Sequence, residues 1–446
     1  MMKVGFAEYD ITPPIGKNIP GGFKPWVTEE PARGKLLATA MAVTAQGTTL
    51  ILVSTDTLSM QVSFSDRIRN RIAEATGVPF AQIMVASTHT HTGGAPDYQL
   101  WLCPPDPEVA GLTEKGVVNA AIEAYRNQSE ARLGVGIGEE RRFSFCRDFY
   151  MADGTMRMNP PRKTEEDRAA MLRTVATPDH SVNVMRVDDE NGDVRGFIVN
   201  YANHPDCHAK DKKSFSADFP GALRRTLKRI YGEDLFVLFF NGTAGDINCI
   251  DFKNRTDKSY YSNGKNAPEA IGAGLGSTVV EINMGICADV TEPVLGAISG
   301  SVQLDRRYKS EEQFRWAQEI AKDMESHDSQ TRAYATEYLE SDDDVTPIID
   351  FEIHTLLLGP WAIVGLPSEI FTDIGKLIKR ASPFEHTLIV ELANGTHGYL
   401  ATKVAHDYGL YETKLSKINA CTAPDSASRV VDATLKQLYR LKEQIR

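Results

Sequence analysis

The chain has 446 residues, of which 42% are hydrophobic and 24% are charged, and it carries a formal net charge of −11. This length and composition allow a sizeable core in one large domain or in two smaller ones. The negative charge argues against nucleic acid and against an anionic membrane surface as partners, because both attract concentrated Lys and Arg.

Short apolar, β-branched runs alternate with longer amphipathic segments, which indicates an α/β fold. After a strand-like N-terminal run, strands are predicted over residues 40–45, 49–54, 82–86, 131–137, 182–187, 196–201, 235–240, 293–304, 350–358, 361–365 and 387–391. Helices are predicted over residues 65–76, 113–127, 220–231, 267–284, 310–328, 370–380 and 426–444.

Two polar stretches interrupt this alternation. Residues 308–345 contain EYLESDDD and are interpreted as a helical insertion on the surface rather than as a separate domain. Residues 146–178 are punctuated by Gly and Pro and are predicted to form a long loop over the core, a kind of loop that is often functional. We therefore expect a single domain over residues 1–446.

The cysteine pattern and the N-terminus bear on the compartment. Six cysteines are scattered without a CxxC pair, which fits reduced thiols better than a disulfide framework. The N-terminus has no apolar segment of signal-peptide length, and no stretch approaches a membrane span of roughly 20 apolar residues. The expectation is a cytoplasmic protein without stable membrane insertion.

The motif STHTHTGG follows a predicted strand and contains two histidines, His89 and His91. On extended backbone, residues two apart point to the same face, and Gly93-Gly94 lets the chain turn sharply afterwards. Two imidazoles on one face at a strand end suit a metal site or an acid/base pair. The simpler alternative is a polar turn that happens to hold two histidines.

Other strand ends carry further polar residues. His204 ends the strand in GFIVNYANHP, Glu369 follows the strand in WAIVGLPSE, and Asp56 ends TLILVSTD, where it would orient a ligating histidine. His208, beside a lysine-rich segment, is interpreted as exposed. The backbone N–H groups of NGTAGDIN could bind a developing oxyanion.

These strand ends suggest a metal centre. The ligands of a catalytic zinc often come from separate strand ends in one crevice, and two His with one Glu leave room for water. Zinc lowers the pKa of that water to about 7 and polarises a scissile carbonyl. The prediction is a hydrolase with Zn²⁺ as cofactor and a small molecule as substrate.

The same motifs resemble, in order over nearly the whole chain, the catalytic domain of the neutral ceramidase family. The similar segments are GFAEYDITPP, THTHTGG, NYANHP, GLPSEIF, LANGTHGYLAT, YET and FSFCRD. The resemblance implies mixed β-sheets flanked by helices in a layered αββα-like sandwich, with the active site at strand carboxyl ends. It implies the zinc ligands His89, His204, Glu369 and Tyr399, the catalytic residues His91, Tyr411, Arg147 and Asn248, and the substrate-binding residues Gly21, Gly22 and Asp246.

The leading hypothesis is a zinc amidohydrolase that cleaves an N-acyl bond by metal-activated water. In it, His91 and Tyr411 hydrogen-bond the oxyanion, and Arg147 positions the substrate. Asn248 stands in GDINCI where the family has a serine, and we expect no C-terminal Ig-like domain of the kind that the secreted members carry. A membrane ceramide is therefore not the expected substrate.

Three other hypotheses remain. A zinc esterase or deacetylase acting on a small polar substrate, such as a sugar or a lactone, would use the same site. A two-metal phosphoesterase is disfavoured because no Asp-x-His motif opens the chain. A non-enzymatic zinc-binding protein is disfavoured because structural zinc sites are usually closed and rich in Cys.

Two features have simpler explanations. The run IGAGLGS at residues 271–277 resembles a dinucleotide-binding loop but follows no strand, so it predicts close helix packing instead. Cys207 and Cys249 lie near the expected crevice and are interpreted as small buried thiols.

Overall fold

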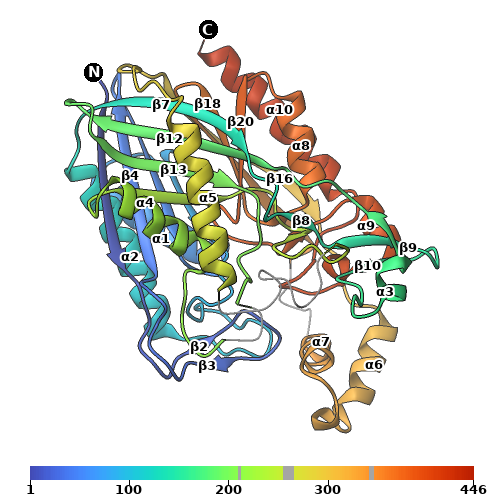
Figure 1. The fold of residues 1–446 in the computed structure, drawn as a ribbon. Helices are drawn as coiled ribbons and strands as arrows, with labels where there is room; N and C mark the ends of the chain where they lie inside the picture. Colours follow the sequence, from blue (N-terminus) through green and yellow to red (C-terminus); the bar gives the residue numbers. More distant parts are fainter. Residues whose placement is uncertain (209–211, 255–265, 341–345, 446) are drawn as a thin grey trace.

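A large and a small β-sheet pack face to face between layers of helices in the computed structural model, which describes residues 1–208, 212–254, 266–340 and 346–445 (Figure 1). The large sheet has eight strands in the order β14 (Phe236–Asn241), β13 (Val194–Tyr201), β12 (Ser181–Asp189), β7 (Ser129–Glu139), β1 (Lys3–Asp10), β4 (Leu37–Ala45), β5 (Thr48–Thr55) and β6 (Ile83–Ser87). The small sheet has four, in the order β16 (Leu295–Asp305), β17 (Ile348–Leu358), β18 (Trp361–Leu366) and β20 (His386–Glu391).

Both sheets are mixed. Neighbouring strands run antiparallel except for the pairs β13–β14, β5–β6 and β18–β20, which are parallel. Side chains alternate between two buried faces along the strands: on β5, Leu50 and Leu52 face the small sheet, whereas Ile51 and Val53 face helices. Leu356, Ile363 and Leu388 close the inter-sheet core from the other side.

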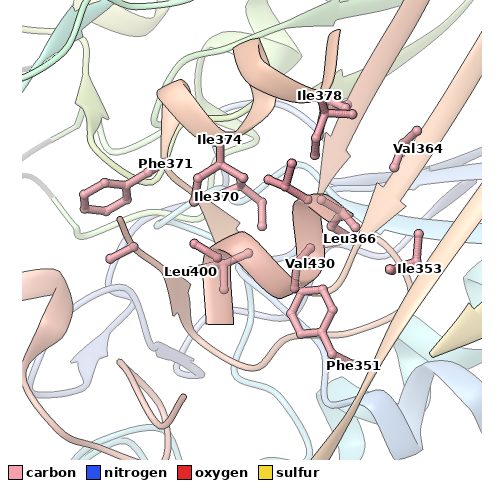
Figure 2. Close-up of a cluster of buried hydrophobic side chains, with 14 of the residues drawn as sticks. Phe351, Ile353, Val364, Leu366, Ile370, Phe371, Ile374, Ile378, Leu400 and Val430 are labelled. Carbon is pink, nitrogen blue, oxygen red and sulfur yellow. The ribbon is translucent and has the colours of Figure 1, made fainter. Parts of the chain in front are cut away.

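Helices cover the outer faces of both sheets. On the large sheet these are α1 (Val62–Thr76), α2 (Pro107–Arg126), α4 (Asp218–Tyr231) and α5 (Ala267–Asn283). On the small sheet α8 (Thr372–Ala381) and α10 (Ser426–Gln444) do the same, and Figure 2 shows Ile374, Ile378 and Val430 packing with Phe351 and Leu366. The four layers confirm the predicted αββα-like arrangement of mixed sheets and helices.

Three sheet edges meet at the centre of the molecule. β6 and β14 are the two edge strands of the large sheet and β20 is an edge of the small one, yet all three contact one another. In the last three residues of β6, Ser87 N donates to Leu392 O (3.2 Å) and Val85 O accepts from Asn394 N (2.7 Å). These contacts cover edges that would otherwise be unpaired, and they bring polar segments that follow several strands into one region.

The predicted strands and helices are present with ends shifted by a few residues, except in one helix. The predicted helix 310–328 is wrong in its length: α6 (Glu311–Ala321) is followed by a short 3-10 turn (Met324–Ser326) and a new helix, α7 (Ser329–Leu339). Asp328 caps α7, because its side chain accepts from the backbone N–H groups of Gln330 and Thr331.

The segment 146–178 is also not the predicted loop. It contains a three-stranded sheet of β9 (Asp148–Met151), β10 (Met156–Met158) and β11 (Met171–Thr174), with α3 (Glu165–Ala170) between the last two. Its apolar residues Phe149, Met151 and Met171 form a small core of their own, too sparse to show as a periodic pattern.

The remaining elements are short. They are β2 (Asn18–Ile19), β3 (Trp26–Val27), β8 (Phe145–Cys146), β15 (Ile247–Asn248), β19 (Glu369–Ile370), β21 (Tyr399–Leu400), α9 (Lys403–Tyr408) and the 3-10 turns Phe80–Gln82 and Tyr411–Thr413. Over the described ranges, every helix is too short or too polar to span a lipid bilayer.

The run IGAGLGS lies in α5 and packs against α4, as predicted. A Cβ on Gly272 would lie 2.4 Å from Ala222 Cβ, and one on Gly276 would lie 2.8 Å from Thr226 Cγ2. The glycines therefore allow two helices to approach at backbone contact.

Candidate metal centre

Three histidine side chains converge beyond the ends of β6 and β13. The Nε2 atoms of His89 and His204 are 3.2 Å apart, and His91 Nε2 lies 3.3 Å from the first and 3.0 Å from the second. The two loops are joined by a backbone hydrogen bond from His91 N to Pro205 O (3.0 Å). His89 and His204 are buried and His91 is half-buried.

The sequence predicted that His89 and His91 lie close together, but the backbone conformation that brings them together differs from the expected one. β6 ends at Ser87, and His89 has a φ of 69°, in the left-handed region that a non-glycine residue rarely adopts. The pair therefore meets on backbone that leaves the extended conformation at His89, and not because both residues share one face of a strand.

The hydrogen bonds of the rings leave their Nε2 atoms free for a cation. His89 Nδ1 donates to Leu58 O (2.8 Å), and His204 Nδ1 contacts Ala244 O (3.3 Å), so each Nδ1 carries a proton, and a neutral ring has its lone pair on Nε2. Each Nε2 then presents a lone pair toward the others. Burial lowers the pKa of His204 and of His91 well below the ordinary value, and the neighbouring His89 lowers both further.

Glu369 adds a carboxylate to this group. Its Oε2 lies 3.2 Å from His89 Nε2, is buried, and accepts no hydrogen bond from the described residues. Burial alone would raise the pKa of Glu369, but His89, together with His204 and Arg147, lowers the pKa to about 2. The carboxylate is therefore ionised, and it offsets the burial that would otherwise lower the pKa of His89, which is raised.

These distances fit a tetrahedral metal ion. Ligand atoms about 2.0–2.1 Å from zinc lie about 3.3 Å from one another, so the separations of 3.0–3.3 Å between the imidazole nitrogens match such a site. The carboxylate oxygen at 3.2 Å from His89 Nε2 matches as well. Nitrogen and oxygen donors of this kind suit zinc among the common metals.

Tyr399 lies beside Glu369 because β19 and β21 pair in parallel, with these two residues as register partners. Its hydroxyl accepts from Arg147 Nη2 (3.1 Å), and Arg147 Nε donates to Glu412 Oε1 (2.7 Å). Burial raises the pKa of Tyr399, whereas the charge of Arg147 opposes that rise.

A cavity of about 630 Å³ opens at the three histidines and Glu369. The cluster residues His89, His91 and Glu369 line it, together with Tyr399 and Tyr411. The rest of its wall includes the predicted substrate-binding residue Gly22 and side chains from four chain segments: Phe23, Tyr98, Trp101, Ala333, Thr336, Glu337, Glu340, Lys417 and Asn419. A volume of this size holds a drug-sized molecule.

Two predicted catalytic residues lie away from the described lining of this cavity. The buried Arg147 guanidinium donates hydrogen bonds to Glu412, Tyr399 and Gly245 O (2.6 Å). Its hydrogen-bonding groups are therefore directed at other residues of the protein and not at the cavity. Asn248 Nδ2 donates to Asn159 Oδ1 (2.7 Å). The expected substrate contacts of Arg147 and Asn248 are therefore not supported by their surroundings.

Two predicted substrate-binding residues, Gly21 and Asp246, are not among the described residues that line the cavity. A Cβ on Gly21 would lie 2.0 Å from His91 O, so this glycine packs on the backbone of the histidine motif. Asp246 is buried and accepts from Thr372 N (2.8 Å) at the start of α8. Burial raises the pKa of Asp246 to about 7.

Asp56 also differs from its expected role. Its carboxylate accepts from Leu37 N (2.8 Å) and pairs with Arg224 Nη2 (3.0 Å), and the Leu58 carbonyl takes the place expected for it beside His89. Thr88 Oγ1 donates to Asp56 (3.3 Å), which fixes the residue before His89. Asp56 therefore supports the histidine loop through the backbone.

Glu391 is a residue that the sequence motifs did not single out. It is fully buried, and its two oxygens accept from Asn241 Nδ2 (2.9 Å), Ala244 N (3.0 Å) and Ile370 N (3.1 Å). Ala244 O faces His204, and Ile370 follows Glu369, so one carboxylate ties together two loops of the cluster. A glutamate ending an otherwise apolar strand is the signal that could have indicated it.

Other sequence features lie outside the cluster. His208 is buried and contacts Arg33 Nη1 (3.1 Å) and Ser216 Oγ (2.9 Å), so the interpretation of an exposed side chain is wrong. Cys207 and Cys249 are buried free thiols, as predicted.

No protein-family model matches the sequence, and no curated protein does. Among solved structures, the neutral ceramidase from Pseudomonas aeruginosa is similar, with a TM-score of 0.74 and 16% identity over 99% of this chain and 75% of that one. A structure described as a ceramidase complexed with C2 has a TM-score of 0.76 and 15% identity, with the same coverage. At such identities the likeness concerns the fold alone, and the fold of this chain is that of the neutral ceramidases.

Proposed function

We propose that this protein is a zinc-dependent hydrolase that cleaves an amide bond of a small N-acylated substrate. The observation that carries the proposal is the group of three imidazole Nε2 atoms, 3.0–3.3 Å apart, beside the ionised Glu369 at one cavity. The neutral ceramidase fold supports the amide bond as the target, because the similar structures are of enzymes named for an N-acyl lipid.

His89, His204 and Glu369 are the ligands that we assign first. The two histidines have their rings oriented through Nδ1, and Glu369 Oε2 has no other use among the described residues. A bound zinc ion supplies Lewis-acid chemistry, since it lowers the pKa of water and polarises a carbonyl group.

Tyr399 and His91 compete for the fourth position. His91 Nε2 is as close to the other imidazoles as they are to each other. We assign the position to Tyr399, because Arg147 donates to its hydroxyl oxygen and thereby favours the phenolate. His91 then does not bind the metal ion and lines the cavity.

The roles left for His91 and Tyr411 concern the substrate. Both line the cavity, and burial raises the pKa of the Tyr411 hydroxyl, which keeps it protonated as a hydrogen-bond donor. We propose that His91 and Tyr411 stabilise the negative charge that develops on the carbonyl oxygen. Arg147 and Glu412 act as positioning residues for Tyr399 and do not contact the substrate.

A zinc-dependent esterase or deacetylase acting on a small polar substrate is the second candidate. The specific observation in its favour is the polar part of the cavity wall, which includes Gln99, Thr336 and Asn419. Such groups favour a hydrogen-bonding substrate over the alkyl chains of a membrane ceramide.

The ligand assignment is tested by the zinc content of purified variants. The wild type should retain close to one zinc ion per chain, and His89→Ala and His204→Ala should lose it. His386→Ala is the matched control, because this histidine lies outside the cluster at the start of β20. Full zinc occupancy in His89→Ala would refute the assignment.

Two further comparisons complete this test. Zinc loss in Tyr399→Phe with retention in His91→Ala supports the phenolate, and the reverse result makes His91 the fourth ligand. Matched N-acyl amides and esters of the same alcohol or amine skeleton then separate the two candidate activities by their kcat/KM values. A protein that binds zinc but cleaves neither class contradicts the proposed function.

A further inference from the structure

The cavity wall formed by α7 carries charge that the metal centre does not explain. Ala333, Thr336, Glu337 and Glu340 reach the cavity from α7 and the residue after it, and Lys417 lies beside them. We refer to these five residues as the α7 wall. α7 lies with α6 at one end of the molecule (Figure 1), and the inference drawn from this wall rests on the proposed hydrolase function.

Glu337 is held in place by neutral groups only. Its Oε2 accepts from Ser416 Oγ (2.7 Å), and its Oε1 accepts from Lys417 N. The side-chain ammonium of Lys417 pairs instead with Glu340 (2.9 Å). Over the described residues Glu337 has no ion-pair partner, so the α7 wall carries one negative charge in excess.

Aromatic rings line the same cavity as Glu337. Phe23, Trp101 and Tyr411 line the same cavity, and the ring centroids of Phe23 lie 5.0 Å from Trp101 and 6.2 Å from Tyr411. Trp101 has a φ of 53°, a strained conformation for a bulky residue that persists only where contacts hold it. Its ring also packs on Tyr334 of α7, at a centroid distance of 5.0 Å.

An excess carboxylate beside aromatic faces favours a cation. An ammonium group gains Coulomb energy from the carboxylate and further energy from the aromatic rings. Tyr334, whose ring packs on Trp101, already has an ammonium group beside it, since Lys414 Nζ lies 5.8 Å from its ring centroid. An alkyl chain would instead have to remove water from Glu337 without compensation, and an anion would be repelled.

We propose that the α7 wall is a subsite for a protonated amino group, so that the substrate is a compact amide or ester carrying an ammonium group away from the scissile bond. The cavity of about 630 Å³ accommodates such a molecule together with its acyl group. Glu337 is the specificity-determining residue, and the aromatic rings of Phe23 and Trp101 flank the bound group.

Three ureas of matched length test the subsite without being hydrolysed. The probes are (5-aminopentyl)urea, hexylurea and 6-ureidohexanoate, which differ only in ending in an ammonium, a methyl or a carboxylate group. Titration calorimetry on the full zinc-loaded protein should show the ammonium probe binding about tenfold more tightly than hexylurea, and the carboxylate probe most weakly.

Glu337→Gln should reduce the preference for the ammonium probe several-fold, since the amide oxygen still accepts a hydrogen bond but the charge is gone. Glu325→Gln is the matched control, because this exposed glutamate lies in the turn before α7 and pairs with Arg332. The control should keep the wild-type order of affinities.

A second variant allows the subsite to be tested even if Glu337→Gln fails to fold. Thr336 is exposed on α7 and lines the cavity. Thr336→Trp should therefore weaken the binding of all three ureas, because the larger side chain narrows the cavity at the α7 wall. Leu339→Trp, at an exposed position of α7 outside the described lining, should leave the affinities of the three ureas unchanged.

The outcomes separate the two proposals. Equal affinities for the three probes, no binding at all, or an unchanged preference in Glu337→Gln would overturn the subsite. A protein that binds the probes in the expected order but cleaves no amide or ester keeps the subsite and loses the proposed function.

Discussion

His89 is the residue at which backbone strain and chemistry coincide. Its left-handed φ of 69° is matched by Leu392 (51°) and Asn394 (61°) in the loop that follows β20. Each such residue costs about 1–3 kcal/mol and persists only where surrounding contacts over-determine it. Here the contacts are present, because His89 N donates to Thr57 O (3.0 Å) and its ring is fixed by Leu58 O. The left-handed backbone at His89 directs its imidazole toward His91 and His204.

Glu391 provides a sharper test at the residue scale. All of its three hydrogen-bond partners are N–H donors, so Glu391→Gln would turn its own NH₂ group toward one of them. Asn241 cannot easily reorient, because its Oδ1 already accepts from Asn203 N (3.2 Å). We expect the variant to lose about 1–3 kcal/mol of unfolding free energy.

The same substitution should also weaken zinc binding, because Glu391 ties Ala244 to the residue after Glu369. Denaturant unfolding measures the first effect and competition with a chelator measures the second. Glu385→Gln, an exposed site near the start of β20, is the control and should change neither. A normal zinc affinity in Glu391→Gln would show that the loops are positioned without it.

At the scale of elements, the close contact of α4 and α5 depends on missing side chains. Gly272→Ala would bring a Cβ to 2.4 Å from Ala222 Cβ and 2.6 Å from Leu223 N, so the two helices must separate. We expect a loss of about 1–3 kcal/mol of unfolding free energy from this overpacking.

Gly111→Ala is the matched substitution in α2. Nothing lies within 4 Å of a Cβ at this position, so only helix propensity changes, and stability should rise by about 0.5–1 kcal/mol. Both values come from denaturant unfolding curves. Equal effects at the two sites would contradict the backbone contact between α4 and α5.

The elements also show what the sequence could predict. The long strands and helices follow from apolar periodicity, and the four side chains His89, His91, His204 and Glu369 follow from polar motifs at strand ends. The break between α6 and α7 was missed because Asp328 caps a helix inside a continuous amphipathic pattern. The three-stranded sheet of β9, β10 and β11 was missed because its strands are only three or four residues long.

The surroundings of the site residues were harder to predict than their identities. Arg147 bonds Glu412 across a sequence separation of 265 residues, and no local pattern announces such a contact. The same holds for Asp56 and Arg224, which are 168 residues apart. Motifs indicate which side chains form the candidate site, whereas the partners that position them depend on the tertiary structure.

At the scale of the whole molecule, His354 links the small sheet to the 3-10 turn that precedes β6 of the large sheet, and we expect it to make stability depend on pH. It lies on β17, its Nε2 donates to Ala81 O (2.8 Å), and its Nδ1 accepts from Asn394 Nδ2 (2.8 Å). Protonation of Nδ1 would place two donors face to face. Burial, followed by the charge of Arg69, lowers the pKa of His354 to about 4.

The sign of the effect follows from this depressed pKa. The unfolded chain binds a proton near the ordinary histidine pKa of about 6.5, whereas the folded protein does not until about pH 4. Stability is therefore fully present above pH 6.5 and is lost as the pH falls toward 4, by on the order of 3 kcal/mol for this one residue. His397, with its pKa also lowered to about 4 by burial, acts in the same direction.

Unfolding free energies measured at several pH values between 7.5 and 4 test this account. His354→Gln keeps one donor and one acceptor but cannot take up a proton, so its curve should flatten by up to about 1.4 kcal/mol per pH unit relative to the wild type. His386→Ala removes a half-buried histidine with no hydrogen bond of this kind among the described residues, and should leave the slope unchanged. A wild-type slope in His354→Gln would mean that the acid sensitivity arises elsewhere, with His397 as the next site to substitute.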